Sequence, residues 1–451
     1  MTKTISSTNA AGVQATRPLR VVRSFPTVRT YRLYVWAFLA APLLSRFNSF
    51  ATLAILFGCL LTVHLIASDP RLPWYGIQAI GISVIWLAYG ALVGSVPAMS
   101  RLSDFISTEG RILVALIPLA GLAAARTNRA HFRVLERTFA FIAAFGGLTL
   151  MAWYLDKPVA GPRKLFFGFT SSHHAVAFVY AITLIALFTT RRGRSGWRFL
   201  LRSGLIGTCA LIIVESGSRA TLVGLVLGLV STLAWRTSVD RLVQVAIAAV
   251  VGVVLVITFV PRASSTFNSL MSPDFRSQLG DVYDTGKVPA GGSEDDVNLL
   301  LRSADWGTAL RNFTSSPVVG IGPWRFDDLV TRHAGIEGLT WLAVDGRAIN
   351  SDRHAHNLYL HVLAETGVLG LILIGSLWIG LLVAVRRRLQ SPHTPAHVIP
   401  WLRASWVGIV FGFGVSLTDI GLITPAMTFG LSIVIATTLG AGNGGETRDA
   451  T

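Results

Sequence analysis

The chain has 451 residues, of which 52% are hydrophobic and 14% charged, and its mean hydropathy is +0.58. A soluble protein carries about 25% charged residues, so this composition excludes an ordinary soluble globular protein and indicates a polytopic membrane protein. Lys and Arg (39) exceed Asp and Glu (23) by 16. In a membrane protein this excess is typical of cytoplasmic loops, so we expect no nucleic-acid partner.

The chain begins with a polar, basic segment, and residues 1–32 are expected to form a disordered cytoplasmic tail before the first span. This segment has no cleavage pattern typical of a secretory signal peptide. The two cysteines, Cys59 and Cys209, lie far apart in separate apolar runs. Their placement predicts neither a disulfide nor a metal site, and both are expected to pack as small hydrophobic side chains.

Apolar runs recur along the rest of the chain, and each is a candidate membrane-spanning helix. The twelve runs lie at residues 33–45, 49–67, 74–96, 111–125, 138–153, 173–190, 203–214, 217–235, 242–260, 357–385, 401–418 and 420–440. Several are shorter than the ~20 residues of a straight span, and a re-entrant hairpin is an alternative for the first two. We therefore expect an all-α, polytopic transmembrane helix bundle of about 12 spans. The expected divisions are spans 1–9 in 33–260, a large loop in 261–356, spans 10–12 in 357–440 and a tail in 441–451.

The basic residues predict how the bundle is oriented. With the N-terminus inside, the inner segments hold 23 of the 39 Lys and Arg, and the short outer loops hold seven. The other nine lie in the loop 261–356 together with twelve acidic residues, and long loops are exempt from the orientation rule. This bias predicts that both termini lie in the cytoplasm and that the large loop lies outside.

The loop 261–356 is the segment long enough for structure outside the membrane. Its first part is rich in Ser, Gly, Pro and Asp, which predicts irregular structure. Residues 297–313 place apolar side chains at helical spacing, which predicts an amphipathic helix near the membrane surface. The following sequence, SSPVVGIGPWRF, is typical of a Pro/Gly turn. We therefore expect short helices within the loop.

Polar residues at the outer ends of spans are candidates for function, because ionisable groups in membrane segments are costly. His356 and Asn357 stand where the tenth span begins. Asn357 has the residue type of a helix N-cap, whereas the imidazole of His356 can accept a proton from a substrate hydroxyl. Arg219 begins the eighth span four residues after Glu215. It either pairs with that carboxylate or binds an anion at the helix start.

Further candidates lie on the loop helix and inside the tenth span. Arg302, Arg311 and Arg325 either face solvent or line a site, and the sequence leaves both interpretations open. Glu365 lies about two turns into the span, and His361 shares its helix face four residues earlier. A pairing of these two side chains is the structural interpretation, while a buried glutamate in a span also favours a functional role.

Histidines gather in two places, but their spacing does not predict a metal centre. His354, His356 and His361 surround the start of the tenth span. The five-residue step from His356 to His361 departs from the i,i+4 spacing of two ligands on one helix face. His173 and His174 open the sixth span from the outside, where the preceding serines can cap the helix. We therefore predict no metal and no cofactor.

The tenth span also carries a signature. His356, Asn357, nine further residues and then GVLG at 367–370 resemble the pattern H-[NSQ]-x9-G-x-x-[GTY] of the O-antigen ligase family, whose superfamily includes O-antigen and exopolysaccharide polymerases. SGSRATLVG at 216–224 resembles the family's serine-arginine at the start of a span. Residues 302–322 are similar to the stretch before the family's long-loop turn. With the spans and the single large loop, the resemblance covers most of the chain.

The resemblance implies a metal-independent glycosyltransferase of the bacterial inner membrane, with its active site on the periplasmic face. Its donor would be a glycan linked to undecaprenyl pyrophosphate, and its acceptor another glycan or lipid A–core. His356 would be catalytic, as a general base or by positioning the acceptor hydroxyl, while two arginines would hold the pyrophosphate. The candidate substrate-binding residues are Arg219, Arg302, Asn357, Glu365 and Arg325.

Other functions remain open at this point. A ligase and a polymerase would share the donor and differ in acceptor, and the acidic excess in the loop slightly favours a polymerase. A secondary transporter or a lipid-linked glycan flippase is the alternative from another class. Transporters typically carry broken spans and charges at mid-bilayer, whereas most candidate charges here lie at the outer ends of spans. A sensor or scaffold is disfavoured by the short, glycine-rich loop.

Overall fold

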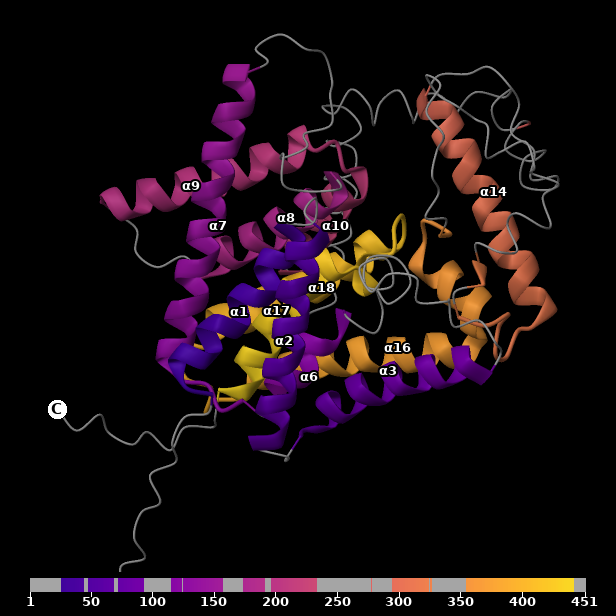
Figure 1. Ribbon diagram of the computed structural model, residues 1–451. Helices are drawn as coiled ribbons and strands as arrows, with labels where there is room; N and C mark the ends of the chain where they lie inside the picture. Colours follow the sequence, from indigo (N-terminus) through magenta and orange to yellow (C-terminus); the bar gives the residue numbers. More distant parts are fainter. Residues whose placement is uncertain are drawn as a thin grey trace, which may run out of the picture.

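The computed structural model describes residues 26–43, 48–68, 72–92, 115–123, 125–156, 173–190, 196–232, 277, 294–323, 325–326 and 354–441. Within these residues the chain is all-α with twelve α-helices, and a lone bridge joins Thr127 to Ala441. The C-terminal helices α17 (Ile399–Ser416) and α18 (Pro425–Gly440) lie in the middle of the molecule (Figure 1). The chain is a polytopic helical membrane protein, as its composition predicts.

The described helices follow the predicted apolar runs and the predicted loop helix. Before the loop they are α1 (Val28–Leu43), α2 (Asn48–Ser68), α3 (Trp74–Leu92), α6 (Ile117–Ala123), α7 (Arg129–Asp156), α8 (His173–Thr189), α9 (Trp197–Glu215) and α10 (Arg219–Val230). The loop helix is α14 (Glu294–Ser315). It is followed by α16 (Leu358–Gln390) and, between α17 and α18, by the short 3-10 helix η4 (Gly421–Ile423).

Five of these helices are long and apolar enough to span a membrane, namely α3, α7, α9, α16 and α17. Shorter apolar segments lie in α2, α8, α10 and α18. The predicted number of about twelve spans therefore stays a prediction. The predicted span at 242–260 lies outside the described residues, as do most of the large loop, residues 1–25 of the predicted N-terminal tail and residues 442–451 of the predicted C-terminal tail. Residues 28–32, which we expected in the disordered tail, instead form the start of α1, where the side chain of Tyr31 is buried.

The start of α7 differs from the predicted apolar run, which begins only at residue 138. The helix begins at Arg129 because its first turns are amphipathic. Phe132 and Leu135 are buried, while Arg133 and Arg137 are exposed. A search for uniformly apolar runs misses an amphipathic turn of this kind, because exposed arginines interrupt its buried apolar side chains.

Two glycines four residues apart bring α10 against α17. A Cβ on Gly224 would lie 2.8 Å from the carbonyl oxygen of Phe411, and one on Gly228 would lie 2.9 Å from that of Val407. Small residues at this spacing are typical of membrane helices whose backbones approach closely. The contact fixes the start of α10, where Arg219 stands, relative to the end of α17.

Basic and other polar residues gather at opposite ends of the bundle. At one end, the backbone N–H of Thr127 donates to the carbonyl oxygen of Gly440 at 3.1 Å, and Arg388 donates to that of Leu439. The start of α1 lies here too, since Nε2 of His131 is 2.9 Å from the carbonyl oxygen of Pro26 and the hydroxyl of Tyr31 is 2.6 Å from that of Thr437. The starts of α1 and α7 and the ends of α16 and α18 therefore meet at this end. The helices at this end carry the exposed arginines Arg129, Arg133, Arg137, Arg386 and Arg387. The opposite end gathers the starts of α8, α10 and α16.

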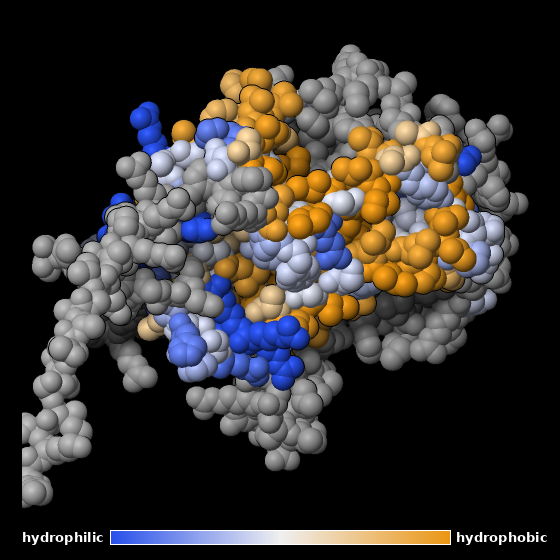
Figure 2. Space-filling view, turned by 90° about the horizontal axis from the view of Figure 1, so that it is seen from below, coloured by the Kyte–Doolittle hydropathy of each residue, from blue (hydrophilic) through white to orange (hydrophobic). Residues whose placement is uncertain are grey.

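Large hydrophobic side chains cover much of the outer surface. Exposed ones on α2 and α3 include Phe50, Leu53, Leu60, Val63, Ile77, Val84 and Ile85. Figure 2 shows hydrophobic residues gathered over a broad part of the face seen from below, with hydrophilic residues concentrated at one side. Soluble monomers rarely expose so large an apolar surface, so this face fits the hydrocarbon of a bilayer.

Candidate active site

The residues before α16 build its start. Asn357 is the N-cap: its side-chain oxygen accepts a hydrogen bond from the backbone N–H of Leu360 at 3.1 Å, and its amide nitrogen donates to the carbonyl oxygen of Leu417 at 3.0 Å. His356 has φ = 45°, the single positive φ at a non-glycine residue in the described part of the chain. Such backbone strain costs about 1–3 kcal/mol and is typical of functional sites. Nδ1 of this histidine is buried, with no hydrogen-bond partner among the described residues.

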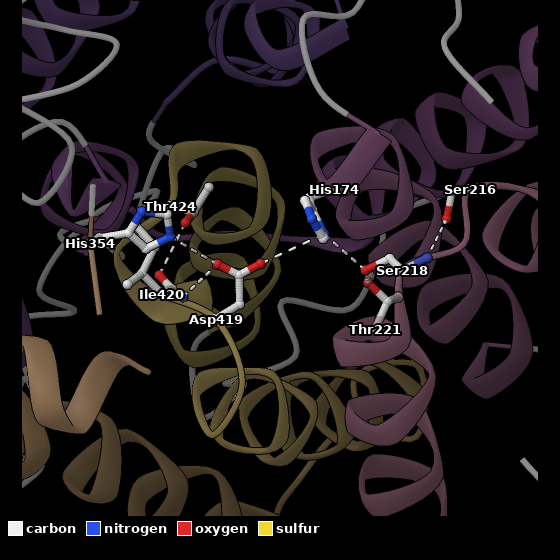
Figure 3. A network of polar contacts seen from close by, with 8 residues as sticks. All are labelled: His174, Ser216, Ser218, Thr221, His354, Asp419, Ile420 and Thr424. Atoms are coloured by element: carbon white, nitrogen blue, oxygen red, sulfur yellow. Dashed lines mark hydrogen bonds and ion pairs between the residues drawn. The ribbon is translucent and has the colours of Figure 1, made fainter. Parts of the chain in front are cut away.

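The carboxylate of Asp419, in the loop between α17 and α18, faces the histidines at the starts of α16 and α8. Asp419 is 6% exposed, and its Oδ1 accepts a hydrogen bond from the backbone N–H of Ile420 at 2.8 Å. The same oxygen lies 3.4 Å from Nε2 of His354, and the carbonyl oxygen of Asp419 accepts from the N–H of Leu358 at 3.1 Å. Figure 3 shows the carboxylate between His354 and His174. Asp419 therefore joins the α17–α18 loop to the start of α16.

The starts of α8 and α10 complete this network. Nδ1 of His174 lies 3.7 Å from Oδ2 of Asp419 and 3.2 Å from the hydroxyl of Ser218. Ser218 is the N-cap of α10, and its hydroxyl lies 2.8 Å from that of Thr221 (Figure 3). The next residue is Arg219, so its half-buried side chain begins at the edge of the network.

The charges of the site act on one another. Burial, together with the charges of His354 and Arg302, lowers the pKa of His356 to about 2. Burial opposes ionisation of Asp419, but the hydrogen bond from His354 and the nearby histidines outweigh it and lower the pKa of this carboxyl. Burial also lowers the pKa of Arg302; Arg219 adds to this effect and Asp419 opposes it. The field therefore favours a neutral His356 beside a charged carboxylate and two guanidinium groups.

Three of the predicted site residues thus meet at one end of the bundle. Arg219 comes from α10, Arg302 from α14 and His356 from the segment before α16, although 137 positions separate the first from the last. Asn357 lies beside them, with both ends of its amide engaged in protein contacts. The roles predicted for these four residues stay predictions, which their convergence supports.

Glu365 and Arg325 belong to a neighbouring group of contacts. Oε2 of Glu365 lies 3.7 Å from Nε2 of His361, and its Oε1 accepts a hydrogen bond from the backbone N–H of Phe326 at 3.4 Å. Arg325 donates from Nη1 to the carbonyl oxygen of Ile321 at 3.4 Å. The Glu365 contact holds Phe326 on α16, and the Arg325 contact lies within the segment that precedes it, so both side chains have a structural role. Their predicted roles in substrate binding stay predictions.

Two residues of the network were missed or assigned another role. Asp419 was not singled out, although it is the one acidic residue between Glu365 and Glu446 and lies between two predicted spans. That isolation in an apolar region is the signal that could have found it. The structure places His174, which we expected at a capped helix start, against Asp419. The side chain of His173 lies outside the described part of the chain.

The same residues bear on the prediction that no metal takes part. Ligand atoms of His354, His356 and Asp419 lie within 4.8 Å of one another, a spacing that could hold a metal ion. His361, which the sequence placed with these histidines, is not in this group. The charge of Arg302 acts on both His356 and Asp419, and it would oppose a second cation. The absence of a metal stays a prediction.

The segment that holds these arginines and His356 matches a known family. Residues 204–375 match the family model described as O-antigen ligase. The chain contains an O-antigen ligase domain. This domain includes the second part of α9, all of α10 and α14 and the first half of α16, and it implies a ligase- or polymerase-type membrane function in polysaccharide biosynthesis. The resemblance predicted from the signature is therefore confirmed. Asp419 and His174 lie outside the matched segment, and no curated protein matches the chain.

Proposed function

We propose that the protein is a metal-independent glycosyltransferase that takes a glycan from an undecaprenyl-pyrophosphate-linked donor at the periplasmic face of the bacterial inner membrane. The observation that carries the proposal is the setting of His356 within the O-antigen ligase domain. The ring centroid of His356 lies 4.2 Å from that of His354, and the charges of Arg302 and Asp419 act on His356. A proton acceptor and anion-binding groups are thus combined in one place.

Arg302 and Arg219 suit the leaving group. In the transfer, the acceptor oxygen bonds to the anomeric carbon, the bond from that carbon to the phosphate oxygen breaks, and the electron pair leaves with undecaprenyl pyrophosphate. Pyrophosphate needs charge stabilisation more than protonation, and guanidinium groups supply it through bidentate contacts. The burial that lowers the pKa of Arg302 also strengthens its attraction for an anion, because water screens the charge less.

His356 suits the acceptor. A pKa of about 2 keeps the imidazole neutral at physiological pH, so it has a lone pair for the proton of the acceptor hydroxyl. The same low pKa, whose largest cause is burial, makes the ring a weak proton acceptor before the donor binds. The pyrophosphate charge then offsets that of Arg302, and Asp419 stabilises the imidazolium that forms. Donor binding therefore raises the basicity of His356 before transfer.

The distribution of arginines supports a periplasmic site. The exposed arginines of α7 and α16 lie at the end of the bundle opposite to His356 and Asp419. Basic residues near span ends favour the cytoplasm, so this rule directs the site outward. The start of α1 and the end of α18 lie at the basic end, which favours two cytoplasmic termini.

The acceptor would be another glycan or lipid A–core. Purified protein in liposomes, given a lipid-linked glycan and an acceptor, should form a larger glycan product and release undecaprenyl pyrophosphate in equal amounts. Movement of intact donor across the bilayer without release would instead indicate a flippase. In cells, loss of the gene should leave single repeat units if the protein is a polymerase, and full-length chains on the carrier lipid if it is a ligase.

A further inference from the structure

The signature glycine of α16 meets the turn that follows α14. This turn, residues 316–322 (SPVVGIG), is called the loop turn here. It joins α16 through four backbone hydrogen bonds: Ile321 N–H to Ala364 O (2.9 Å), Gly322 N–H to Glu365 O (2.9 Å), Val368 N–H to Pro317 O (2.9 Å) and Leu369 N–H to Val318 O (3.2 Å). These groups are available because α16 is interrupted at Gly367, where φ is 62° and ψ is −162°.

Glycine is required on both sides of this contact. Gly320 has φ = 70° and Gly367 has φ = 62°, a left-handed backbone that favours glycine. A Cβ on Gly320 would collide with the backbone of residues 365–366, and one on Gly367 would collide with the backbone of residues 318–319. We call this reciprocal contact the glycine clasp. Backbone hydrogen bonds thus join the loop turn directly to α16.

Other contacts extend the clasp to α14 and α3. Ala309 of α14 belongs to a small buried cluster whose other members are Phe326, Ala355 and Ala364. Arg302 precedes Ala309 by seven residues and shares its helix face. On the other side, the hydroxyl of Tyr89 on α3 donates to the carbonyl oxygens of Val319 at 2.9 Å and Gly320 at 3.3 Å. Because α14 leads directly into the loop turn, fixing the turn fixes the face that carries Arg302.

We propose that Gly320 and Gly367 are positioning residues: the glycine clasp sets α14 on α16 and so places Arg302 for the pyrophosphate of the donor. The proposal rests on the proposed function, because it takes Arg302 as a donor-binding residue. It explains why the signature contains Gly367, which lies ten residues beyond Asn357 and takes no part in the transfer chemistry itself. The clasp acts on donor binding through Arg302, and not on the acceptor.

Gly320→Ala and Gly367→Ala test the proposal in the full-length protein in liposomes. Each should raise the KM for the lipid-linked donor by roughly 10- to 100-fold, because misplacement of a binding group by about 1 Å has effects of this size. The acceptor KM should change by less than twofold. The matched control is Gly375→Ala on the same helix, where a Cβ meets nothing within 4 Å, and it should leave both constants unchanged.

A double-mutant cycle separates positioning from general damage. In an Arg302→Ala background, Gly367→Ala should raise the donor KM by less than twofold, because the group it positions is gone. A full effect in that background, or an equal rise in the acceptor KM, would overturn the proposal. If Arg302→Ala alone leaves the donor KM unchanged, the proposed function itself fails, which is a different result.

A milder variant covers the case in which the alanine variants do not fold. Tyr89→Phe removes one hydroxyl from the loop turn and should raise the donor KM about threefold, with faster hydrogen exchange at Ile321, Gly322, Val368 and Leu369. Rapid exchange of these four amides in the wild-type protein would show that the clasp is open, and would also overturn the proposal. Unchanged exchange and donor KM in Tyr89→Phe would refute the part assigned to α3.

Discussion

Asp419→Asn removes one charge from the centre of the site and leaves the shape of the side chain nearly unchanged. The carboxylate lies 3.4 Å from Nε2 of His354 and 3.7 Å from Nδ1 of His174. It also raises the pKa of His356 against the effects of burial and Arg302. In our account Asp419 stabilises the imidazolium of His356 during transfer, so the substitution should act on kcat.

The size of the effect follows from the distance between Asp419 and His356. Ligand atoms of Asp419 and His356 lie within 4.8 Å of each other, where two unit charges interact by about 1–4 kcal/mol, and about 1.4 kcal/mol corresponds to a tenfold change in rate. The kcat of Asp419→Asn should therefore fall by roughly 5- to 700-fold. The donor KM should not rise, because the substitution removes a negative charge from the surroundings of Arg302, where the pyrophosphate would bind.

Initial rates of undecaprenyl pyrophosphate release, measured at varied donor concentration, separate the two constants. A thermal melt of the same samples shows whether the variant is folded, since the backbone N–H of Ile420 still finds an acceptor oxygen on asparagine. A folded Asp419→Asn protein with wild-type kcat would refute the role of the carboxylate. A raised donor KM with unchanged kcat would refute the assignment of Asp419 to proton transfer.

Three further predictions concern the same site. Arg302→Ala and Arg219→Ala should each raise the donor KM at least tenfold, while Arg386→Ala at the opposite end should not; equal activity of all three would remove the arginine pair from donor binding. Because the pKa of His356 is lowered to about 2, the unfolded chain binds a proton below pH 6.5 that the folded chain does not. The free energy of unfolding therefore decreases as the pH is lowered. From pH 7.5 to 5.0, wild-type protein should therefore lose about 2 kcal/mol more stability than His356→Gln in matched unfolding curves, and parallel curves would refute the burial of a neutral imidazole. Asn357→Ala should cost about 1–2 kcal/mol through the lost cap, and Asn357→Asp, which keeps the acceptor, should recover part of it in the same melts.

Much of the fold could be predicted from the sequence, because lipid-facing helices must be apolar over their whole length. The run 357–385 and the helix α16 agree at their start within one residue, since Asn357 caps the helix. The helix continues to Gln390, past the arginines at 386–388, because backbone hydrogen bonds do not require apolar side chains. The interruption at Gly367 could not be predicted from hydropathy, because it depends on backbone contact with the distant loop turn.

The candidate site was predicted where a residue type stood out in its local sequence. His356 and Arg219 are polar residues at the starts of apolar helices, and the family signature supports the first of them. Asp419 was missed because its meaning depends on a contact with His354, 65 positions earlier, and spacing along one chain does not reveal which loops meet. His174 was interpreted as part of a helix start for the same reason.

The central claim is that His356 accepts the proton of the acceptor hydroxyl in glycosyl transfer from an undecaprenyl-pyrophosphate-linked donor. Single-turnover release of undecaprenyl pyrophosphate with donor and acceptor both saturating tests it most directly, because donor binding does not limit the rate. His356→Ala should slow release about 10²- to 10⁴-fold, whereas His393→Ala, an exposed histidine outside the site, should match the wild-type protein. Release by His356→Ala at the wild-type rate would contradict the account.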